Sequence, residues 1–407
     1  MKTIIIGSVA AGVSAAAKIG AVGSGQVTVY ERGMFFSCGS CGLPHYLAHP
    51  EESLGEAIAS KEKQLEALGI KALRRHEVQS IDAAKREITV QDLETGRVFT
   101  DQYDRLVLAT GAVNATAEVP GCRKMGVHTL RRVEDVIFLR EFIKTPFVRD
   151  IVVLGANIHG LEIAKAFLKR GRNVRIIEKS GRFLPDFDAE VAAQVRQKLE
   201  RAGVSIHLGE AVTAFEGRTY VETVRTAQSS YPCDLCICAD DLVPVSTLLA
   251  SAGATLDSNG AVRINRNFET SLSGIYAAGE CAGIAEGTQS TLSLHVGGLE
   301  LARTGMTEEM ARQSGLQVRS VTVTAHDRPG ICPNPKEVTL KLVCDANGRI
   351  VGAQGWGEKN VAARINAIAV AVAAGMTAQQ LANVDFVYSS AVSSLWDPIQ
   401  MACTAVR

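Results

Sequence analysis

The N-terminal stretch combines an apolar run, a turn containing glycines, and a second apolar run that ends in an acid. The first run, residues 3–6, leads into Gly7 and Gly12, and the second ends at Glu31. This order predicts a strand, a tight turn, a helix and a parallel strand. Such a unit binds the pyrophosphate of a dinucleotide at the helix N-terminus and a ribose hydroxyl at the acid. The stretch therefore predicts a dinucleotide-binding unit of an α/β fold.

The same pattern recurs in the middle of the chain. A second apolar run, residues 150–154, leads into Gly155 and Gly160, and a following apolar run ends at Glu178. Two such units in one chain are far more specific than one. We therefore expect two dinucleotide sites.

Both turns depart from the usual glycine spacing. Val9 replaces the middle glycine of the first turn, and Asn157 replaces that of the second. Asparagine tolerates positive φ better than most residues, so we expect the second turn to be kept. Glu178 favours NADH over NADPH, because a carboxylate binds a 2′-hydroxyl and repels a 2′-phosphate. Lys179 and Arg182 lie close in sequence and oppose this preference.

Two cysteines follow shortly after Glu31, the acid that ends the first pattern. Cys38 and Cys41 precede Leu43, Tyr46 and Leu47, which are spaced as on one helix face. This spacing predicts Cys41 in the first turn of a helix, where the positive dipole end favours a thiolate. Cys38 and Cys41 also form a Cys-x-x-Cys pair that can become an internal dithiol. The alternative is a pair of buried structural cysteines.

Composition excludes several other classes of protein. The chain has 43 basic and 43 acidic residues, so it shows no charge signature of nucleic-acid or membrane-surface binding. No apolar stretch is long enough to cross a bilayer. Ten cysteines without a regular framework indicate a reducing compartment, and we expect a cytoplasmic protein. Three of them, at 233–238, lie in an apolar strand pattern and predict a core and no metal site.

Two further strands end in small residues. One ends in Ala109, Thr110 and Gly111, and another leads into Gly279 and Glu280. Small residues let the backbone approach a nucleotide closely. From about residue 318 the pattern changes to strands and an Ala-rich helix, which predicts an interface domain. We expect one dinucleotide domain at 1–115 and 250–317, a second at 116–249, and the interface domain at 318–407.

The order of these features resembles the pyridine nucleotide-disulfide oxidoreductases over essentially the whole chain. Residues 40–47 and 388–398 are most similar to the single-cysteine branch, which contains coenzyme A-disulfide reductase, NADH oxidase and NADH peroxidase. The resemblance implies an α/β fold with two Rossmann-like domains, for FAD and NAD, and a C-terminal α+β dimerisation domain. It also implies a homodimer in which Cys41 lies beside the flavin and Tyr388 reaches the active site from the partner chain. The residues expected to contact FAD are Gly7, Val9, Ala10, Gly12, Glu31, Arg32, Val78, Ala109, Thr110, Gly111, Gly279 and Glu280. Those expected to contact NADH, with NADPH as the other donor, are Gly155, Asn157, Ile158, Gly160, Glu178 and Lys179.

The function implied is transfer of hydride from NADH through FAD to Cys41 and on to a small disulfide, persulfide or polysulfide. The oxidase and peroxidase members carry a histidine where this chain has Ala10, which favours disulfide reduction. Lys18 alone is a weak match for the phosphates of coenzyme A. The electron acceptor therefore stays open among small sulfur compounds.

Two other functions stay open. The first is an NADH oxidase or peroxidase. The second is a flavin-containing redox sensor or scaffold with weak NAD binding, suggested by Asn157 and by the acidic pair Asp240 and Asp241.

Overall fold

The structure is a computed structural model that describes residues 1–407 except 24, 37–38, 115–118, 241, 286–287 and 407. The chain divides into two compact units. Unit 1 comprises Met1–Gly155, Ala166–Asn173 and Val212–Glu286, and unit 2 comprises Ala156–Lys165, Val174–Ala211 and Gly287–Arg407. Within the described residues, no helix is long and apolar enough to cross a membrane.

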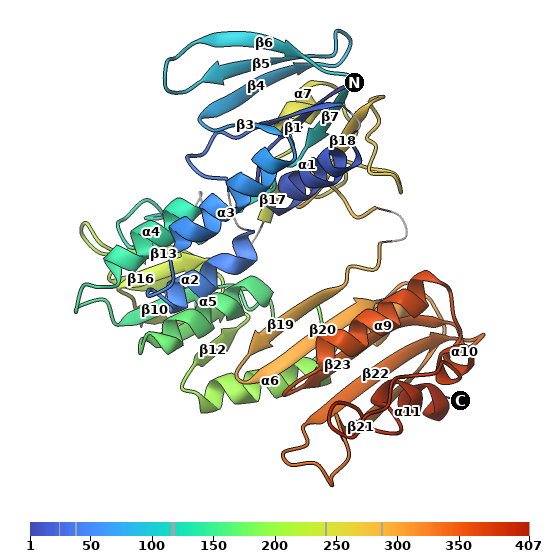
Figure 1. The fold of residues 1–407 in the computed structure, drawn as a ribbon. Coiled ribbons are helices and arrows are strands. Elements are labelled where there is room, and N and C mark those ends of the chain that lie inside the picture. Colours follow the sequence, from blue (N-terminus) through green and yellow to red (C-terminus); the bar gives the residue numbers. More distant parts are fainter. Residues whose placement is uncertain (24, 37–38, 115–118, 241, 286–287, 407) are drawn as a thin grey trace. The chain divides into compact units, whose positions relative to one another are not determined.

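Unit 1 is built on a parallel sheet of five strands in the order β18-β7-β1-β2-β3 (Figure 1). Helix α1 (Ala10–Val22) connects the first two strands of the chain. Ile4 and Ile5 point to opposite faces of the central strand and both are fully buried, as expected for a sheet covered on both sides. The strands are β1 (Lys2–Ile6), β2 (Gln26–Tyr30), β3 (Lys71–Leu73), β7 (Arg105–Leu108) and β18 (Ile275–Ala277).

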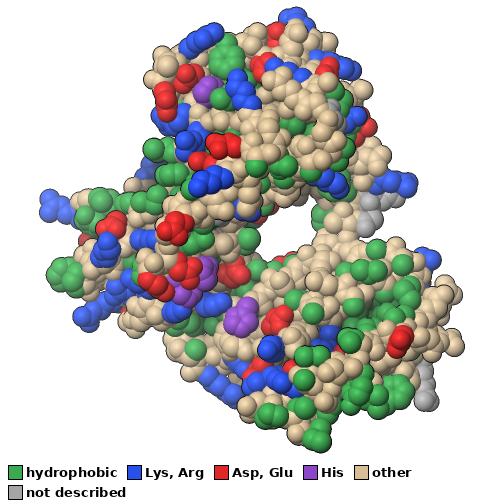
Figure 2. Space-filling model, in the orientation of Figure 1, with side chains coloured by type: hydrophobic (Ala, Val, Ile, Leu, Met, Phe, Trp, Pro, Cys, Tyr) green, Lys and Arg blue, Asp and Glu red, His purple; other side chains and the backbone are tan. Residues whose placement is uncertain are grey.

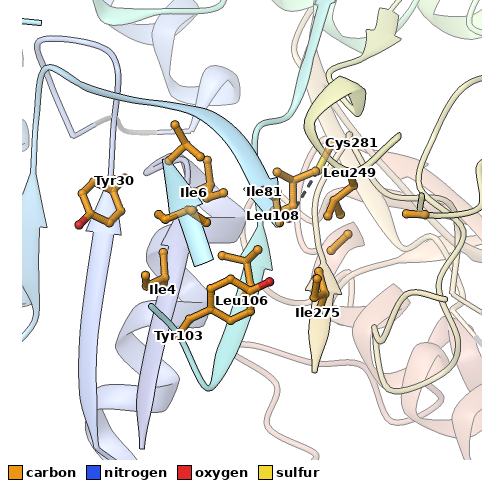
Figure 3. Close-up of a cluster of buried hydrophobic side chains, with 14 of the residues drawn as sticks. Ile4, Ile6, Tyr30, Ile81, Tyr103, Leu106, Leu108, Leu249, Ile275 and Cys281 are labelled. Carbon is orange, nitrogen blue, oxygen red and sulfur yellow. Dashed lines mark hydrogen bonds between the residues drawn. The ribbon is translucent and has the colours of Figure 1, made fainter. Parts of the chain in front are cut away.

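A three-stranded antiparallel sheet packs against one face of this parallel sheet. It consists of β4 (His76–Asp82), β5 (Glu87–Asp92) and β6 (Val98–Gln102). Its buried side chains share one cluster with the parallel sheet. Figure 3 shows Ile4, Ile6, Leu106 and Leu108 within that cluster. This core fixes the carboxyl ends of β1 and β7, where the glycine turns begin.

The remaining elements of unit 1 include a second group of parallel strands. β10 (Asp150–Leu154), β16 (Leu235–Cys238) and β9 (Val127–His128) pair in parallel. Cys236 is completely buried in β16, and burial raises the pKa of its thiol. The other elements are α2 (Leu43–Ala48), α3 (Leu54–Ala67), β8 (Ala112–Asn114), α4 (Val133–Phe142), β13 (Val212–Glu216), β14 (Thr223–Thr226), β15 (Ser230–Pro232), β17 (Leu242–Pro244) and α7 (Thr247–Ser251).

Unit 2 carries an antiparallel sheet of five strands in the order β19-β20-β23-β22-β21. The sequence pattern placed the start of the interface domain at residue 318. Strands β19 and β20 precede that residue but belong to the same sheet as β21, β22 and β23. The domain boundaries stay predictions. The strands are β19 (Leu292–Val296), β20 (Leu299–Gly305), β21 (Val318–His326), β22 (Glu337–Asp345) and β23 (Ile350–Gly357). The other elements of this part of the chain are α5 (Ile158–Lys169), β11 (Asn173–Glu178), α6 (Ala189–Arg201), β12 (Ser205–Leu208), α8 (Glu308–Gln313), α9 (Val361–Ala373), α10 (Ala378–Ala382) and α11 (Pro398–Ala405).

A buried ion cluster connects α6 and α8 to the sheet of unit 2. The ammonium of Lys341, 6% exposed, lies 2.8 Å from Asp188 and 2.8 Å from Glu308, and it also pairs with Glu190. Burial alone would raise the pKa of Glu308, but hydrogen bonds from Lys341 and its neighbours lower it to about 2. A cluster of this kind is costly to break, because each partner left behind is a buried charge. It holds the helices on the sheet.

Candidate functional site

The first glycine turn is closed by direct backbone contacts. A Cβ atom at Gly7, whose φ is 100°, would lie 2.3 Å from the carbonyl oxygen of Ala109. One at Gly12 would lie 1.9 Å from the carbonyl oxygen of Gly7, and one at Gly279 would lie 2.9 Å from the Cβ of Ala11. No other residue type fits these positions without moving the backbone. The small residues predicted around the first turn thus lie together at one edge of the sheet.

The start of α1 leaves its first N–H groups available. Among the described residues no side chain caps the helix at Val9, and Ala10 follows as an exposed first residue. Helix N-termini of this kind bind phosphate groups.

The carboxylate of Glu31 is fixed beside this turn. It accepts hydrogen bonds from the backbone N–H of Ser8 (3.0 Å), from the Ser8 hydroxyl (2.7 Å) and from the N–H of Gly33 (2.7 Å). Arg32 pairs loosely with Glu77 at 3.9 Å. Val78 is buried in the core cluster of unit 1, 7% exposed. The acid that should bind ribose is therefore held in place before any ligand arrives.

Glu178 repeats this arrangement at the second turn. It accepts from the N–H of Ala156 (2.9 Å) and from the N–H of Ser180 (2.8 Å), the same relative positions as Ser8 and Gly33. The carboxylate is fixed by two backbone groups, and lone pairs remain for a ribose diol.

Asn157 keeps the second turn for a reason that the sequence did not predict. The positive φ at this turn belongs to Gly155 (φ 105°), so a left-handed Asn157 was the wrong explanation. The side-chain oxygen of Asn157 instead accepts a hydrogen bond from the N–H of Gly160 (2.9 Å) and caps α5, which begins at Ile158. Gly155 also packs against Asp240, whose backbone nitrogen would lie 3.0 Å from an added Cβ. Asp241 lies outside the described residues.

The two basic residues near Glu178 differ in their surroundings. Arg182 makes a two-pronged ion pair with Glu309, at 2.8 and 2.7 Å. Lys179 is exposed. Because its charge is already paired with a carboxylate, Arg182 attracts a 2′-phosphate of NADPH less strongly. The preference for NADH that Glu178 favours is therefore opposed less than the sequence suggested.

Cys41 is exposed, and its sulfur and the side chain of Ala10 both lie close to Gly39. A Cβ built on Gly39 would lie 3.4 Å from the Cys41 sulfur and 3.5 Å from the Cβ of Ala10. Cys41 lies at the start of a helix, as predicted, but in a 3₁₀ turn, Ser40–Gly42, that leads directly into α2 at Leu43 and not in α2 itself. The reason is Pro44 at the second helical position, since proline favours the first turn of a helix. Cys38 lies outside the described residues.

Arg131 is a residue of this site that the sequence did not reveal. Its guanidinium, 12% exposed, pairs with the carboxylate of Glu280, whose Oε2 would lie 3.9 Å from a Cβ on Gly111. The neighbouring Thr110 hydroxyl donates to the carbonyl of Val245 (2.5 Å). Arg131 stands 149 positions before Glu280 and outside both glycine patterns, so no spacing rule identifies it. The pair neutralises the Glu280 carboxylate at the end of β18.

Tyr388 lies in unit 2, in the exposed segment between α10 and α11. Its side chain is 54% exposed, and Val387, Leu395 and Trp396 are exposed with it. Large apolar side chains gathered in one surface segment indicate an interaction surface. The contact of Tyr388 with a partner's active site stays a prediction.

These features define a class of protein: a chain with two dinucleotide-type glycine turns, each with an acid fixed by backbone N–H groups, and an exposed cysteine. Residues 1–315 match the model of the family described as pyridine nucleotide-disulphide oxidoreductase, and residues 293–396 match the dimerisation domain of that family. The chain therefore belongs to the pyridine nucleotide-disulphide oxidoreductase family. The predicted family, fold class and enzyme class are confirmed, and the family is one of FAD-dependent enzymes that use NADH or NADPH.

Individual relatives cover nearly the whole chain. The NAD(P)H sulfur oxidoreductase (CoA-dependent) of Pyrococcus furiosus is 29% identical over 443 residues, 98% of this chain and 97% of its own. A crystal structure of reduced Bacillus anthracis CoADR-RHD is 26% identical, with a TM-score of 0.93, over 99% of this chain and 79% of its own. The water-forming NADH oxidase of Lactobacillus brevis bound to NADH is 26% identical, with a TM-score of 0.90, over 100% of this chain and 98% of its own.

Proposed function

We propose that this chain passes hydride from NADH through FAD to Cys41 and on to a small disulfide, persulfide or polysulfide. The observation that carries the proposal is the exposed Cys41 sulfur, which lies near Gly39 together with Ala10 of the first glycine turn. Bound FAD supplies the two-electron link between the nicotinamide and that sulfur. In this proposal FAD is held by residues 1–115 and 250–317, and NADH by residues 116–249.

The residues of unit 1 fit an FAD molecule. The uncapped start of α1 would bind the pyrophosphate, and the fixed Glu31 carboxylate would accept the adenosine ribose hydroxyls. Glu280 and Arg131 lie as an ion pair at the neighbouring strand end, near Gly111. At the second turn, Glu178 would accept the ribose hydroxyls of NADH and repel the 2′-phosphate of NADPH.

Cys41 performs the sulfur chemistry. Its thiolate attacks one sulfur of the substrate disulfide, so that a Cys41–substrate disulfide forms, the original S–S bond breaks, and the first product leaves as a thiolate that takes a proton from solvent. Two electrons from NADH then break the mixed disulfide, and the second product leaves as a thiol. The step needs an accessible sulfur, and Cys41 is exposed.

Ala10 favours a sulfur acceptor over peroxide. Cleavage of peroxide needs a general acid beside the leaving hydroxide, and a methyl group at Ala10 cannot donate a proton. NADH oxidase remains the second candidate, because the Lactobacillus brevis oxidase shares the fold over the whole chain.

We further propose a cytoplasmic homodimer in which Tyr388 of one chain completes the site of the other. The match of residues 293–396 to the dimerisation domain supports the assembly. The described cysteines form no disulfide, in keeping with a reducing compartment.

Anaerobic stopped-flow measurements test the function. FAD-loaded protein is reduced with NADH and then mixed with coenzyme A disulfide, a persulfide, polysulfide, peroxide or oxygen. We expect rapid reoxidation by the sulfur compounds and its loss in Cys41→Ser, with flavin reduction unchanged. Cys122→Ser, at a half-buried cysteine of the same unit, is the matched control. Full reoxidation by disulfides in Cys41→Ser, or reoxidation by oxygen or peroxide alone, would contradict the proposal.

A further inference from the structure

Two histidines and a glutamate come together where α2 ends. His45 lies in α2, His49 caps its C-terminus four residues later, and Glu52 lies in the turn before α3. The His45 Nε2 atom lies 2.8 Å from Glu52 Oε2, and one ligand atom from each of the three residues lies within 4.8 Å of the other two. Figure 2 shows histidine side chains among acidic and basic ones on the surface over α2. Two imidazoles and one carboxylate form a common ligand set for zinc.

The hydrogen bonds of His49 prepare its outer nitrogen for a cation. The Nδ1 atom lies 3.0 Å from the backbone carbonyl oxygen of His45, and only a protonated nitrogen can bond a carbonyl. The Nε2 atom of neutral His49 therefore carries a lone pair. The same pattern, one ring nitrogen donating to a carbonyl and the other binding the metal, orients histidine ligands in metalloproteins.

A lysine ammonium now occupies the position beside that lone pair. Lys169 donates a hydrogen bond to Nε2 of His49, and the lysine side chain is exposed. The carboxylate of Glu52 lies 2.8 Å from His45 Nε2. A positive charge thus already lies among these ligand atoms, and Lys169 can move into solvent without leaving a buried charge.

Arg140 holds the backbone of the same turn. Its guanidinium donates to the carbonyl oxygens of Tyr46 (2.8 Å from Nε), His49 (3.0 Å) and Glu52 (3.2 Å). The rings of His45 and His49 stack with their centroids 4.2 Å apart. The three ligand residues therefore lie on one segment whose backbone is held by Arg140. Binding an ion then costs little conformational entropy.

We propose that His45, His49 and Glu52 bind a divalent transition-metal ion such as Zn²⁺, which displaces the ammonium of Lys169. A water molecule would complete a four-coordinate site. The site departs from the expectation that this chain holds no metal, and it is independent of the electron acceptor at Cys41.

The other group of potential ligands shows what excludes an ion. Asp188, Glu190 and Glu308 also lie within reach of one another, but Lys341 is buried among them and bonded to all three. Displacing Lys341 would bury an unpaired ammonium. That cluster therefore serves as a control.

Calorimetric titration of Zn²⁺ into chelator-treated, FAD-loaded protein tests the site. The Cys41→Ser background is used so that the reactive thiol does not bind the metal. We expect one ion per chain, a loss of affinity of at least about tenfold in His45→Ala and in His49→Ala, and a smaller loss in Glu52→Gln. Lys169→Ala should raise the affinity, because it removes the competing ammonium; a structural role for Lys169 alone would not produce this gain.

Matched controls keep the result specific. His207→Ala alters another surface histidine near a glutamate, with His207 Nδ1 3.6 Å from Glu210, and Glu190→Gln alters the lysine-filled cluster. Both should leave the affinity unchanged. The proposal is overturned if no Zn²⁺ binds at micromolar concentration, if His49→Ala binds as tightly as its parent, or if Lys169→Ala binds more weakly. Because the parent already lacks the Cys41 thiol, these outcomes do not depend on the proposed reaction.

Discussion

Replacing Glu178 with serine should change the coenzyme preference by an amount that can be worked from the structure. The carboxylate is fixed by the N–H groups of Ala156 and Ser180, which leaves lone pairs for one or two ribose hydroxyls. A hydrogen bond to a charged group contributes about 1.5–3 kcal/mol, so losing one lowers the affinity for NADH about 10- to 150-fold. Removing a charge about 4 Å from a 2′-phosphate relieves roughly 1–4 kcal/mol, between the solvent and protein-surface limits, and improves NADPH binding at least about fivefold. With the two lower limits multiplied, Glu178→Ser should lower the ratio of the NADH affinity to the NADPH affinity ~50-fold.

The assay is the anaerobic rate of flavin reduction as a function of NADH or NADPH concentration. Glu178→Gln accompanies Glu178→Ser, because the amide keeps an acceptor for one backbone N–H while removing the charge. Glu200→Ser is the control, at an exposed acid that pairs with Arg196 on α6. If both Glu178 variants keep the wild-type ratio of NADH affinity to NADPH affinity within threefold, the second turn does not select its nucleotide through this carboxylate.

Three further predictions concern other parts of the chain. Arg131→Ala should leave the Glu280 charge uncompensated and weaken FAD retention about tenfold or more, measured as the flavin-to-protein ratio after dialysis, and unchanged retention would remove Arg131 from the site. Lys341→Met should lower the melting temperature by several degrees at pH 7, because breaking a buried pair costs about 3 kcal/mol. Since the pKa of Glu308 is depressed from 4.5 to about 2, its contribution is fully present above about pH 4.5 and is lost as the pH falls from there to about 2, so the penalty should shrink across that interval, and a pH-independent penalty would contradict the charge argument. Tyr388→Phe should slow reoxidation by a disulfide at least about tenfold while NADH still reduces the flavin at the wild-type rate, and equal effects on both half-reactions would refute a role at the acceptor.

Local sequence patterns were enough to predict the parts of the fold that depend on neighbours in sequence. Gly7 and Gly155 adopt a positive φ in the tight turn, Gly12 packs against Gly7 within one strand-turn-helix unit, and Glu31 and Glu178 lie at a fixed spacing from those turns. Such contacts follow from the geometry of one supersecondary unit. The fold class could be predicted for the same reason.

Contacts between distant segments could not be predicted. Arg131 meets Glu280 only because two strands of unit 1 end near each other, and Lys341 meets Asp188 only after the sheet of unit 2 has formed. The pairing of His49 with Lys169 joins residues 120 positions apart, and no periodicity links them.

The two helices that follow the glycine turns differ at the residue before their first turn, Val9 for α1 and Asn157 for α5. In the proposed function this difference separates a permanent ligand from a transient one. At α5 the Asn157 side chain already bonds an N–H of the first turn, so the loop stays ordered during the interval between departure of oxidised coenzyme and arrival of the next reduced molecule. At α1, Val9 offers no such acceptor, so the first N–H groups stay available for water or for a phosphate. We therefore expect the flavin to act as a folding component that stays through successive catalytic cycles, while NADH exchanges in every cycle at little conformational expense.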